Sequence, residues 1–181
     1  MKPMRLEDIL FSQGFGTRRV CAGLVQQGYV SVNGEVQKDP GVFFDPDNLK
    51  FKVQGTEWPY FDRAYLMLHK PTGTECSQKP STWPSIYTLL PSPLRLRPQK
   101  AAVQGVQAVG RLDQDTTGLL LLTDDGKFIH RMSSPKHHMP KLYEVTTKHE
   151  ITEQQVEKLL AGVVLDDSPK PVKAAACEKV S

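Results

Sequence analysis

The sequence predicts an α+β protein of two domains: a small helical and hairpin domain in residues 1–58 and a larger domain in residues 64–181. The first segment combines two short helical patterns with a hairpin turn. The second contains apolar strand patterns, and several of its connections are too short for crossover helices, which favours a mixed, mostly antiparallel sheet. Residues 59–63 lie between the two patterns and are expected to form a linker.

The small domain packs its elements closely along the chain. Apolar residues at helical spacing predict a first helix over residues 6–13, and Thr17 is expected to cap a second helix that ends at Gly28. Asn33-Gly34, between two apolar segments, is the strongest short signal for a hairpin. Two helices and a hairpin therefore fit within this segment.

The larger domain mixes strands and helices. Four strands are expected, over residues 65–69, 106–109, 119–123 and 141–148. Three helices are expected, over residues 81–90, after Asp124 or Asp125, and after Thr152, where Gln155 completes a capping-box pattern. Residues 91–107 contain three prolines, Arg95, Arg97 and Lys100, and are expected to form a basic, mobile loop. Residues 171–181 look like a strand that stops without a turn or cap, so we expect the second domain to be truncated.

The composition is that of an ordinary globular protein. Of the 181 residues, 39% are hydrophobic and 24% are charged, and the mean hydropathy is −0.40. These values exclude wholesale disorder and a membrane bundle. The longest aliphatic run, residues 119–122, is too short to span a bilayer, and two acids at positions 7 and 8 interrupt any export signal. We therefore expect a cytoplasmic protein without a membrane partner.

The cysteines and histidines show no metal-binding or disulfide pattern. The three cysteines are far apart in sequence and form no Cys-x-x-Cys pair, so we interpret them as reduced thiols. His130, His137 and His138 lack acidic or cysteine partners at metal-ligand spacing. The sequence therefore predicts no metal site.

The positive charge is concentrated in the middle of the chain. The net charge of +3 and the pI of about 8.7 permit nucleic-acid binding without requiring it. Residues 1–60 carry seven Lys and Arg against seven Asp and Glu, whereas residues 95–148 carry nine against five. The second range surrounds the most unusual segment of the sequence.

That segment is a polar loop, residues 110–118, which presents Arg111, Asp113 and Asp115 together between two apolar strands. One interpretation is a polar turn whose aspartates and threonines accept hydrogen bonds from backbone amides. A glycosidase pair is disfavoured, because adjacent side chains of one loop rarely stand across a sugar from each other. Composition and spacing alone leave a catalytic loop and a plain turn open.

The same loop resembles a known family. Residues 110–126 resemble the signature of the ribosomal RNA pseudouridine synthases, residues 68–73 resemble that family's first motif, and residues 141–145 resemble its tyrosine-bearing strand. The Asp-Thr-Thr-Gly variant, together with residues 134–138, is most similar to the branch that acts on 16S ribosomal RNA of the small subunit. Residues 1–58 resemble the S4-type RNA-binding domain that many of these enzymes carry.

The resemblance implies a chemistry that needs no cofactor. Pseudouridine formation breaks the bond from uracil N1 to the ribose, turns the base and rejoins it through C5. By resemblance Asp113 is the catalytic carboxylate, acting as nucleophile toward the anomeric carbon or assisting departure of the base, and both routes stay open. Arg111 would contact RNA when the target uridine is flipped out, unless it forms a surface ion pair with Asp115. Tyr143 would pack under the flipped base, unless it is a cross-strand packing residue.

Six basic residues are expected to bind RNA. They are Arg18 and Arg19 at a helix start, Lys70 and Lys141 beside strand ends, and Arg95 and Arg97 in the basic loop. For the two lysines the alternative is a solvated position at the surface. The expected partner is 16S ribosomal RNA or an assembling small subunit, bound by a monomer.

One motif of the family has no counterpart in the sequence. The family closes its active site with a later strand-and-helix motif that carries basic and apolar residues, which we expect to lie beyond Ser181. Two alternatives to a 16S enzyme therefore stay open: a non-catalytic RNA-binding protein or fragment that keeps the fold, and a pseudouridine synthase for 23S ribosomal RNA.

Overall fold

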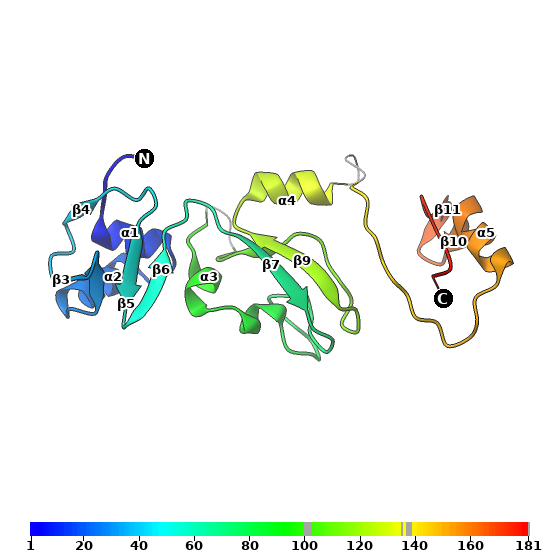
Figure 1. The fold of residues 1–181 in the computed structure, drawn as a ribbon, viewed down its shortest axis with the longest axis horizontal. Helices are drawn as coiled ribbons and strands as arrows, with labels where there is room; N and C mark the ends of the chain where they lie inside the picture. The colour runs from blue at the N-terminus through cyan, green and yellow to red at the C-terminus, as the bar shows by residue number, and fades with distance from the viewer. Residues whose placement is uncertain (100–102, 135, 137–138, 181) are drawn as a thin grey trace. The chain divides into compact units, whose positions relative to one another are not determined.

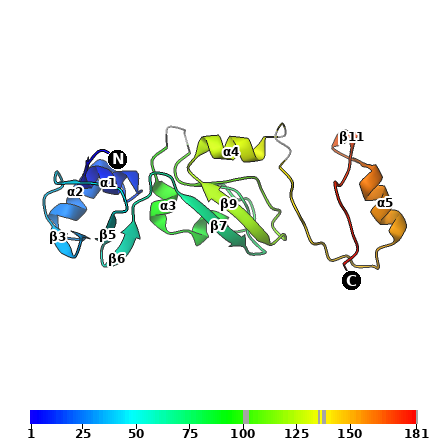
Figure 2. The ribbon, with the colours of Figure 1, turned by 45° about the horizontal axis from the view of Figure 1, so that its top comes forward.

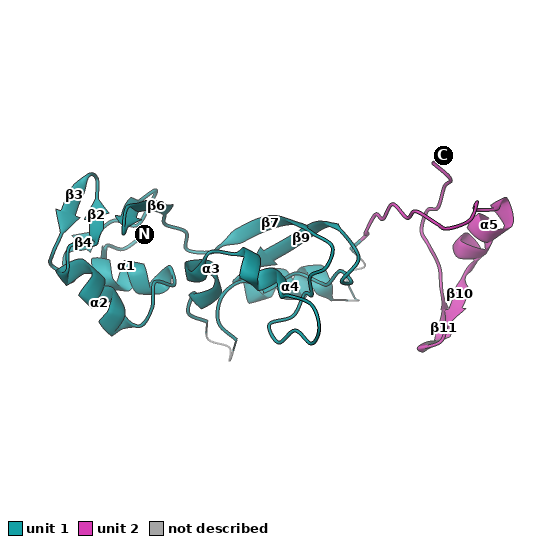
Figure 3. Ribbon diagram, turned by 90° about the horizontal axis from the view of Figure 1, so that it is seen from below, with its two compact units in different colours: residues 1–139 teal, residues 140–181 magenta. Residues whose placement is uncertain are grey.

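The computed structural model describes residues 1–99, 103–134, 136 and 139–180. The chain forms two compact units, Met1–Met139 and Pro140–Ser181, coloured separately in Figure 3. The α+β class and the mostly antiparallel pairing are confirmed. The division between the units lies about 80 residues beyond the linker expected at residues 59–63, because the amino-terminal elements are bonded to the segment that follows them.

The amino-terminal helices form where the sequence predicts them. Helix α1 spans Leu6–Ser12 and helix α2 spans Arg18–Gln26. The Thr17 hydroxyl accepts the backbone N–H of Val20 at 3.3 Å, which confirms the predicted cap. Gly28 follows α2 with a φ of +78°, a conformation in which a side chain would be strained.

A four-stranded antiparallel sheet covers these helices, in the order β3-β2-β5-β6. Its strands are β2 (Val30–Val32), β3 (Glu35–Gln37), β5 (Lys50–Val53) and β6 (Thr56–Pro59). Asn33 and Gly34 join β2 to β3 with φ angles of +53° and +82°, as the predicted hairpin turn requires. A separate short pair joins β1 (Met4–Arg5) to β4 (Phe43–Phe44).

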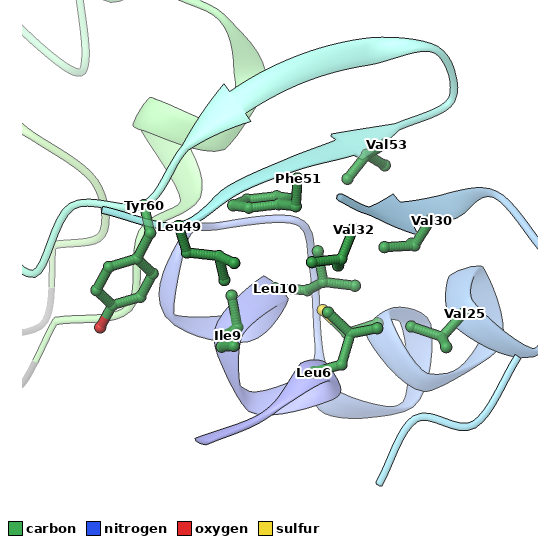
Figure 4. Close-up of a cluster of buried hydrophobic side chains, with 11 residues drawn as sticks. Leu6, Ile9, Leu10, Val25, Val30, Val32, Leu49, Phe51, Val53 and Tyr60 are labelled. Atoms are coloured by element: carbon green, nitrogen blue, oxygen red, sulfur yellow. The ribbon is translucent and has the colours of Figure 1, made fainter. Parts of the chain in front are cut away.

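The core of this region follows from strand alternation. Alternate residues of β2 and β5 point toward the helices, so Val30, Val32 and Phe51 are buried (Figure 4). They pack against Leu6 and Leu10 of α1, both fully buried. Each such side chain stabilises the fold by roughly 1.5–3 kcal/mol.

A second sheet follows in the same unit, in the antiparallel order β7-β9-β8. Strand β7 spans Tyr65–Lys70, β8 spans Gln107–Ala108 and β9 spans Gly118–Thr123. Strands β7 and β9 lie side by side (Figure 1), and their ladder runs from the pair Tyr65–Thr123 to the pair Lys70–Gly118. One face buries Leu120 and Leu122 against Ile86 and Val106.

Three helical segments accompany this sheet. They are the 3-10 helix η1 (Ile86–Leu89), α3 (Ser92–Leu96) and α4 (Gly126–Ser133), which follows β9 and lies along one side of the sheet (Figure 2). Asp125 caps α4 by accepting the N–H groups of Lys127 and Phe128. Tyr65 donates a hydrogen bond to Asp125 at 2.7 Å, which lowers the pKa of that carboxyl.

Two expectations for residues 81–107 are wrong. Only η1 forms within the expected helix 81–90, because Pro84 and the hydrogen bonds of the preceding loop keep residues 81–85 out of it. Residues 91–99 are not an open loop, because residues 92–96 form α3 and Arg97, which follows the helix, is only 4% exposed. Residues 100–102 lie outside the described residues.

The Arg97 guanidinium joins the two regions of the first unit. Its Nε donates to Asp124 at 2.6 Å and one terminal nitrogen donates to Gln13 at 3.0 Å. The other terminal nitrogen donates to the carbonyl oxygens of Phe61 and Asp62, at 2.8 and 3.1 Å. Burial leaves no place for a phosphate contact, so the expectation that Arg97 binds RNA is wrong.

Gly14 allows the two regions to approach this closely. A Cβ at this position would lie 2.0 Å from the carbonyl oxygen of Pro93, and the φ of +90° independently excludes most side chains. The end of α1 and the start of α3 therefore meet backbone to backbone.

The second unit contains α5 (Glu153–Ala161) and an antiparallel pair of β10 (Val163–Leu165) and β11 (Ser168–Val172). The Thr152–Gln155 capping box is present in both directions.

Residues 141–148 do not form the expected strand: they run with no secondary structure and are exposed. The alternation of side chains in this segment fits a strand, but a strand also needs a neighbouring strand to which its backbone groups can hydrogen-bond. Within the described ranges, no helix is long and apolar enough to cross a bilayer.

Replacing Arg97 by Met is expected to lower the free energy of unfolding by about 3–5 kcal/mol, because it leaves the buried Asp124 carboxylate without its cation. Urea unfolding followed by circular dichroism measures the change. Arg95→Ala is the matched control: Arg95 is exposed, and among the described residues its side chain donates only to Ser92, so its loss is expected to cost under about 0.5 kcal/mol. Equal effects of the two substitutions would contradict the structural role of Arg97.

Candidate active site

The loop between β8 and β9 holds its charged side chains outward. Arg111, Asp113 and Asp115 are exposed, and the residues between them are half-buried. The N–H of Thr116 donates to the carbonyl oxygen of Asp113 at 3.1 Å, which closes a turn. Within the described part of the chain, neither Arg111 nor Asp113 uses its side chain in a hydrogen bond or ion pair, so the alternative pair of Arg111 with Asp115 is not formed.

Lys70 anchors the loop between β8 and β9 through backbone carbonyl groups. It ends β7, is completely buried, and its Nζ donates to the carbonyl oxygens of Thr116 at 2.9 Å, Pro71 at 3.1 Å and Gln114 at 3.3 Å. Three carbonyl dipoles thus replace the water that the ammonium loses on burial. Lys70 cannot contact a phosphate, so its expected role in RNA binding is wrong; it positions the loop instead.

A second loop, residues 71–85, is bonded to the first. The N–H of Gly73 donates to the carbonyl oxygen of Gln114 at 2.8 Å, where Gln114 directly follows Asp113. The Glu75 carboxylate accepts the N–H groups of Ser81, Thr82 and Trp83 at 2.8–3.0 Å. These bonds lower the pKa of Glu75 to about 2, so the carboxylate stays ionised. In the sequence, the only signal for Glu75 is that it is the single acid between Asp62 and Asp113.

The remaining basic candidates lie at exposed positions. Arg18 and Arg19 begin α2, where Arg18 pairs with Asp8 and lies 4.4 Å from the centre of the Phe11 ring. Arg95 lies on α3 and is also exposed. Lys100, His137 and His138 lie outside the described residues.

Lys141 and Tyr143 belong to the second unit. Both are exposed, and Tyr143 retains 54% of its accessible surface. The structure therefore brings Asp113 and Arg111 together with the loop of Lys70, and it describes Tyr143 and Lys141 separately.

No group of three or more His, Cys, Asp or Glu side chains in the described ranges could hold a metal ion. What the arrangement offers chemically is an ionisable carboxylate and a guanidinium, both open to a substrate, on a loop fixed by backbone hydrogen bonds.

Family comparison identifies this arrangement. The model of the family described as RNA pseudouridylate synthase matches residues 64–178, and the model of the S4 domain matches residues 4–48. The first match contains Lys70, Asp113 and the whole of the loop between β8 and β9. The chain belongs to the RNA pseudouridine synthases.

Curated relatives agree with this membership. The chain is 37% identical, over 174 residues, to the uncharacterized RNA pseudouridine synthase YtzG of Bacillus subtilis, covering 94% of this chain and 70% of the relative. It is 36% identical to the ribosomal small subunit pseudouridine synthase A of Pasteurella multocida, covering 97% and 72%. It is also similar to a crystal structure of a pseudouridylate synthase, with a TM-score of 0.54, 29% identity and coverage of 98% and 73%.

For a pseudouridine synthase, the charge around the site is strongly one-sided. Residues 63–112 contain seven Lys and Arg side chains and one acid, Glu75. Two of the seven, Lys70 and Arg97, are buried. Arg63, Lys79, Arg95 and Arg111 are exposed and give the segment that leads to Asp113 a positive surface, which favours a polyanionic substrate.

Replacing Lys70 by Met is expected to loosen the loop between β8 and β9 while the rest of the sheet persists. The carbonyl oxygens of Gln114 and Thr116 lose their donor, so the amides of Gly73 and Thr116 should exchange with solvent about tenfold faster or more. Hydrogen exchange measured residue by residue tests this. Lys79→Met, an exposed substitution in the neighbouring loop, serves as control, and unchanged exchange in Lys70→Met would refute the anchoring role.

Proposed function

We propose that the chain converts a specific uridine of 16S ribosomal RNA to pseudouridine, with Asp113 as the nucleophile. The observation that carries the proposal is the exposed carboxylate of Asp113 on a loop anchored by Lys70, within the segment matched by the synthase family model. Several relatives at 32–36% identity are named ribosomal small subunit pseudouridine synthase A, which supports the small subunit as the source of the substrate.

The reaction is an isomerisation. The Asp113 carboxylate attacks the ribose anomeric carbon as the bond to uracil N1 breaks and the electron pair leaves with the base. The base turns, C5 forms the new bond to the anomeric carbon, Asp113 is released, C5 loses its proton and N1 gains one. Arg111 contacts the RNA where the uridine is flipped out, and Tyr143 packs against the flipped base.

The domain organisation serves the same reaction. Residues 1–58 act as the RNA-binding domain, residues 59–63 connect it, and residues 64–181 supply the catalytic region. Arg18, Arg19, Arg95 and Lys141 bind phosphate groups of the RNA. The protein works in the cytoplasm as a monomer, because none of these roles needs a second copy or a membrane.

Replacing Asp113 by Asn is expected to abolish release of tritium from 16S RNA labelled at uracil C5, because the amide cannot attack the anomeric carbon. RNA binding should stay within about twofold, since the two side chains have nearly the same size. Asp115→Asn is the matched control on the same loop, and its turnover should resemble that of the unaltered chain.

Each other outcome of this assay points elsewhere. Turnover by the Asp113→Asn chain would disprove the nucleophile. Release from 23S RNA but not from 16S RNA by the unaltered chain would replace the proposed substrate. Binding without release from either RNA would favour a non-catalytic RNA-binding protein.

Binding of 16S RNA is expected to weaken with salt, since cationic side chains displace counterions from the phosphates. Arg19→Ala should reduce the slope of log K against log [salt] by about 0.7–0.9, the value for one phosphate contact. Filter binding across a salt series measures the slope. Lys50→Ala is the control, because Lys50 pairs with Glu57 at 3.7 Å on the sheet; an unchanged slope in Arg19→Ala would remove Arg19 from the interface.

A further inference from the structure

The loop of residues 75–85, which the proposed mechanism does not use, is unusually well fixed for an exposed segment. Its ends are joined by the hydrogen bonds from Glu75 N–H to the Pro84 carbonyl at 2.9 Å and from Ile86 N–H to the Glu75 carbonyl at 3.0 Å. The Glu75 carboxylate binds three N–H groups on the far side of the loop, and the Ser85 hydroxyl donates to the carbonyl of Ser77. The backbone of this loop is therefore held in a defined place.

The loop presents one large aromatic side chain to solvent. Trp83 keeps 45% of its surface exposed, although its backbone N–H donates a hydrogen bond of 2.8 Å to the Glu75 carboxylate. An exposed tryptophan on a fixed backbone loses little conformational entropy on binding, and tryptophan is among the residues most enriched where binding energy concentrates.

Trp83 also lies close to the catalytic loop. A Cβ built on Gly73 would lie 3.7 Å from two atoms of the indole ring, so the ring packs over this glycine. The N–H of Gly73 is bonded to the carbonyl of Gln114, the residue after Asp113. A single glycine thus separates the indole from the backbone that carries the proposed nucleophile.

The charges around the indole match an RNA strand. In residues 63–112 the one carboxylate, Glu75, is occupied by backbone N–H groups, whereas Lys79 is exposed on the same loop as Trp83. An aromatic face and an exposed cation on one loop are the combination by which proteins bind unpaired nucleotides, with stacking on the base and charge on the backbone.

We propose that Trp83 stacks on an unpaired base of the substrate RNA adjacent to the uridine on which Asp113 acts, and so contributes to the choice of target site. The inference rests on the proposed function, because it places the RNA at the Asp113 loop. Stacking on a neighbouring base strengthens binding of the RNA without touching the reacting atoms, so Trp83 is a specificity-determining residue and not a catalytic one.

The first test is kinetic. Trp83→Ala is expected to raise KM for 16S RNA about tenfold, the effect of losing one stacked base, with kcat within about twofold. Trp83→Phe should recover most of the loss because it restores an aromatic face. Leu89→Ala is the matched control, since Leu89 is 49% exposed in the segment that follows and offers no ring. An unchanged KM in Trp83→Ala, or a loss that Trp83→Phe does not recover, would overturn the proposal.

The second test needs neither turnover nor the Trp83→Ala chain. Trp58→Phe leaves Trp83 as the one tryptophan, and combining it with Asp113→Asn stops the reaction. Added 16S RNA should quench the Trp83 emission, whereas a fully paired RNA duplex should not, because its bases are already stacked. Equal quenching by both RNAs, or by neither, would overturn the stacking.

The two tests also separate this inference from the proposed function. Quenching by 16S RNA, in a preparation whose unaltered chain releases no tritium, would refute the proposed reaction and support stacking. Normal tritium release with an unaffected KM in Trp83→Ala and no quenching would support the reaction and refute stacking.

Discussion

The first unit depends on one buried ion pair, between Arg97 and Asp124. The same Asp124 carboxylate accepts the N–H of Ala64 at 2.9 Å, directly before β7, while it follows the last residue of β9. One carboxylate therefore fixes the far end of the β7–β9 ladder and, through Arg97, the amino-terminal helices. Lys70 fixes the opposite end of the same ladder, where the Asp113 loop ends and β9 begins. The two buried cations, Arg97 and Lys70, thus determine the position of the exposed Asp113 carboxylate.

Local signals in the sequence predicted the elements that depend on neighbouring residues. The Thr17 cap, the hairpin at Asn33-Gly34 and the Thr152 capping box each need contacts within three or four residues, and each is present. The strand expected over residues 141–148 is different, because alternation cannot supply the neighbouring strand whose backbone groups it must pair with.

The site shows the same limit. The loop of Asp113 was recognisable because its residues are contiguous, and the structure keeps that loop exposed. Arg97 and Lys70 were expected to bind RNA, Arg97 as part of a basic loop and Lys70 beside a strand end, but both are buried. Their partners lie far along the chain: Gln13 is 84 residues from Arg97, and Thr116 is 46 residues from Lys70. A pattern of neighbouring residues in the sequence cannot predict a partner that lies so far along the chain.

The Asp113 loop is anchored through its main chain, so its backbone conformation does not depend on which side chains it carries at the anchored positions. Lys70 and Gly73 bind carbonyl oxygens, which every amino acid possesses, so the side chains at positions 114 and 116 can change without loss of these bonds. Substitutions at these two positions can then alter what the loop touches in its substrate while Asp113 stays in place. The loop is thus free to evolve new preferences at little cost to the geometry of the reaction.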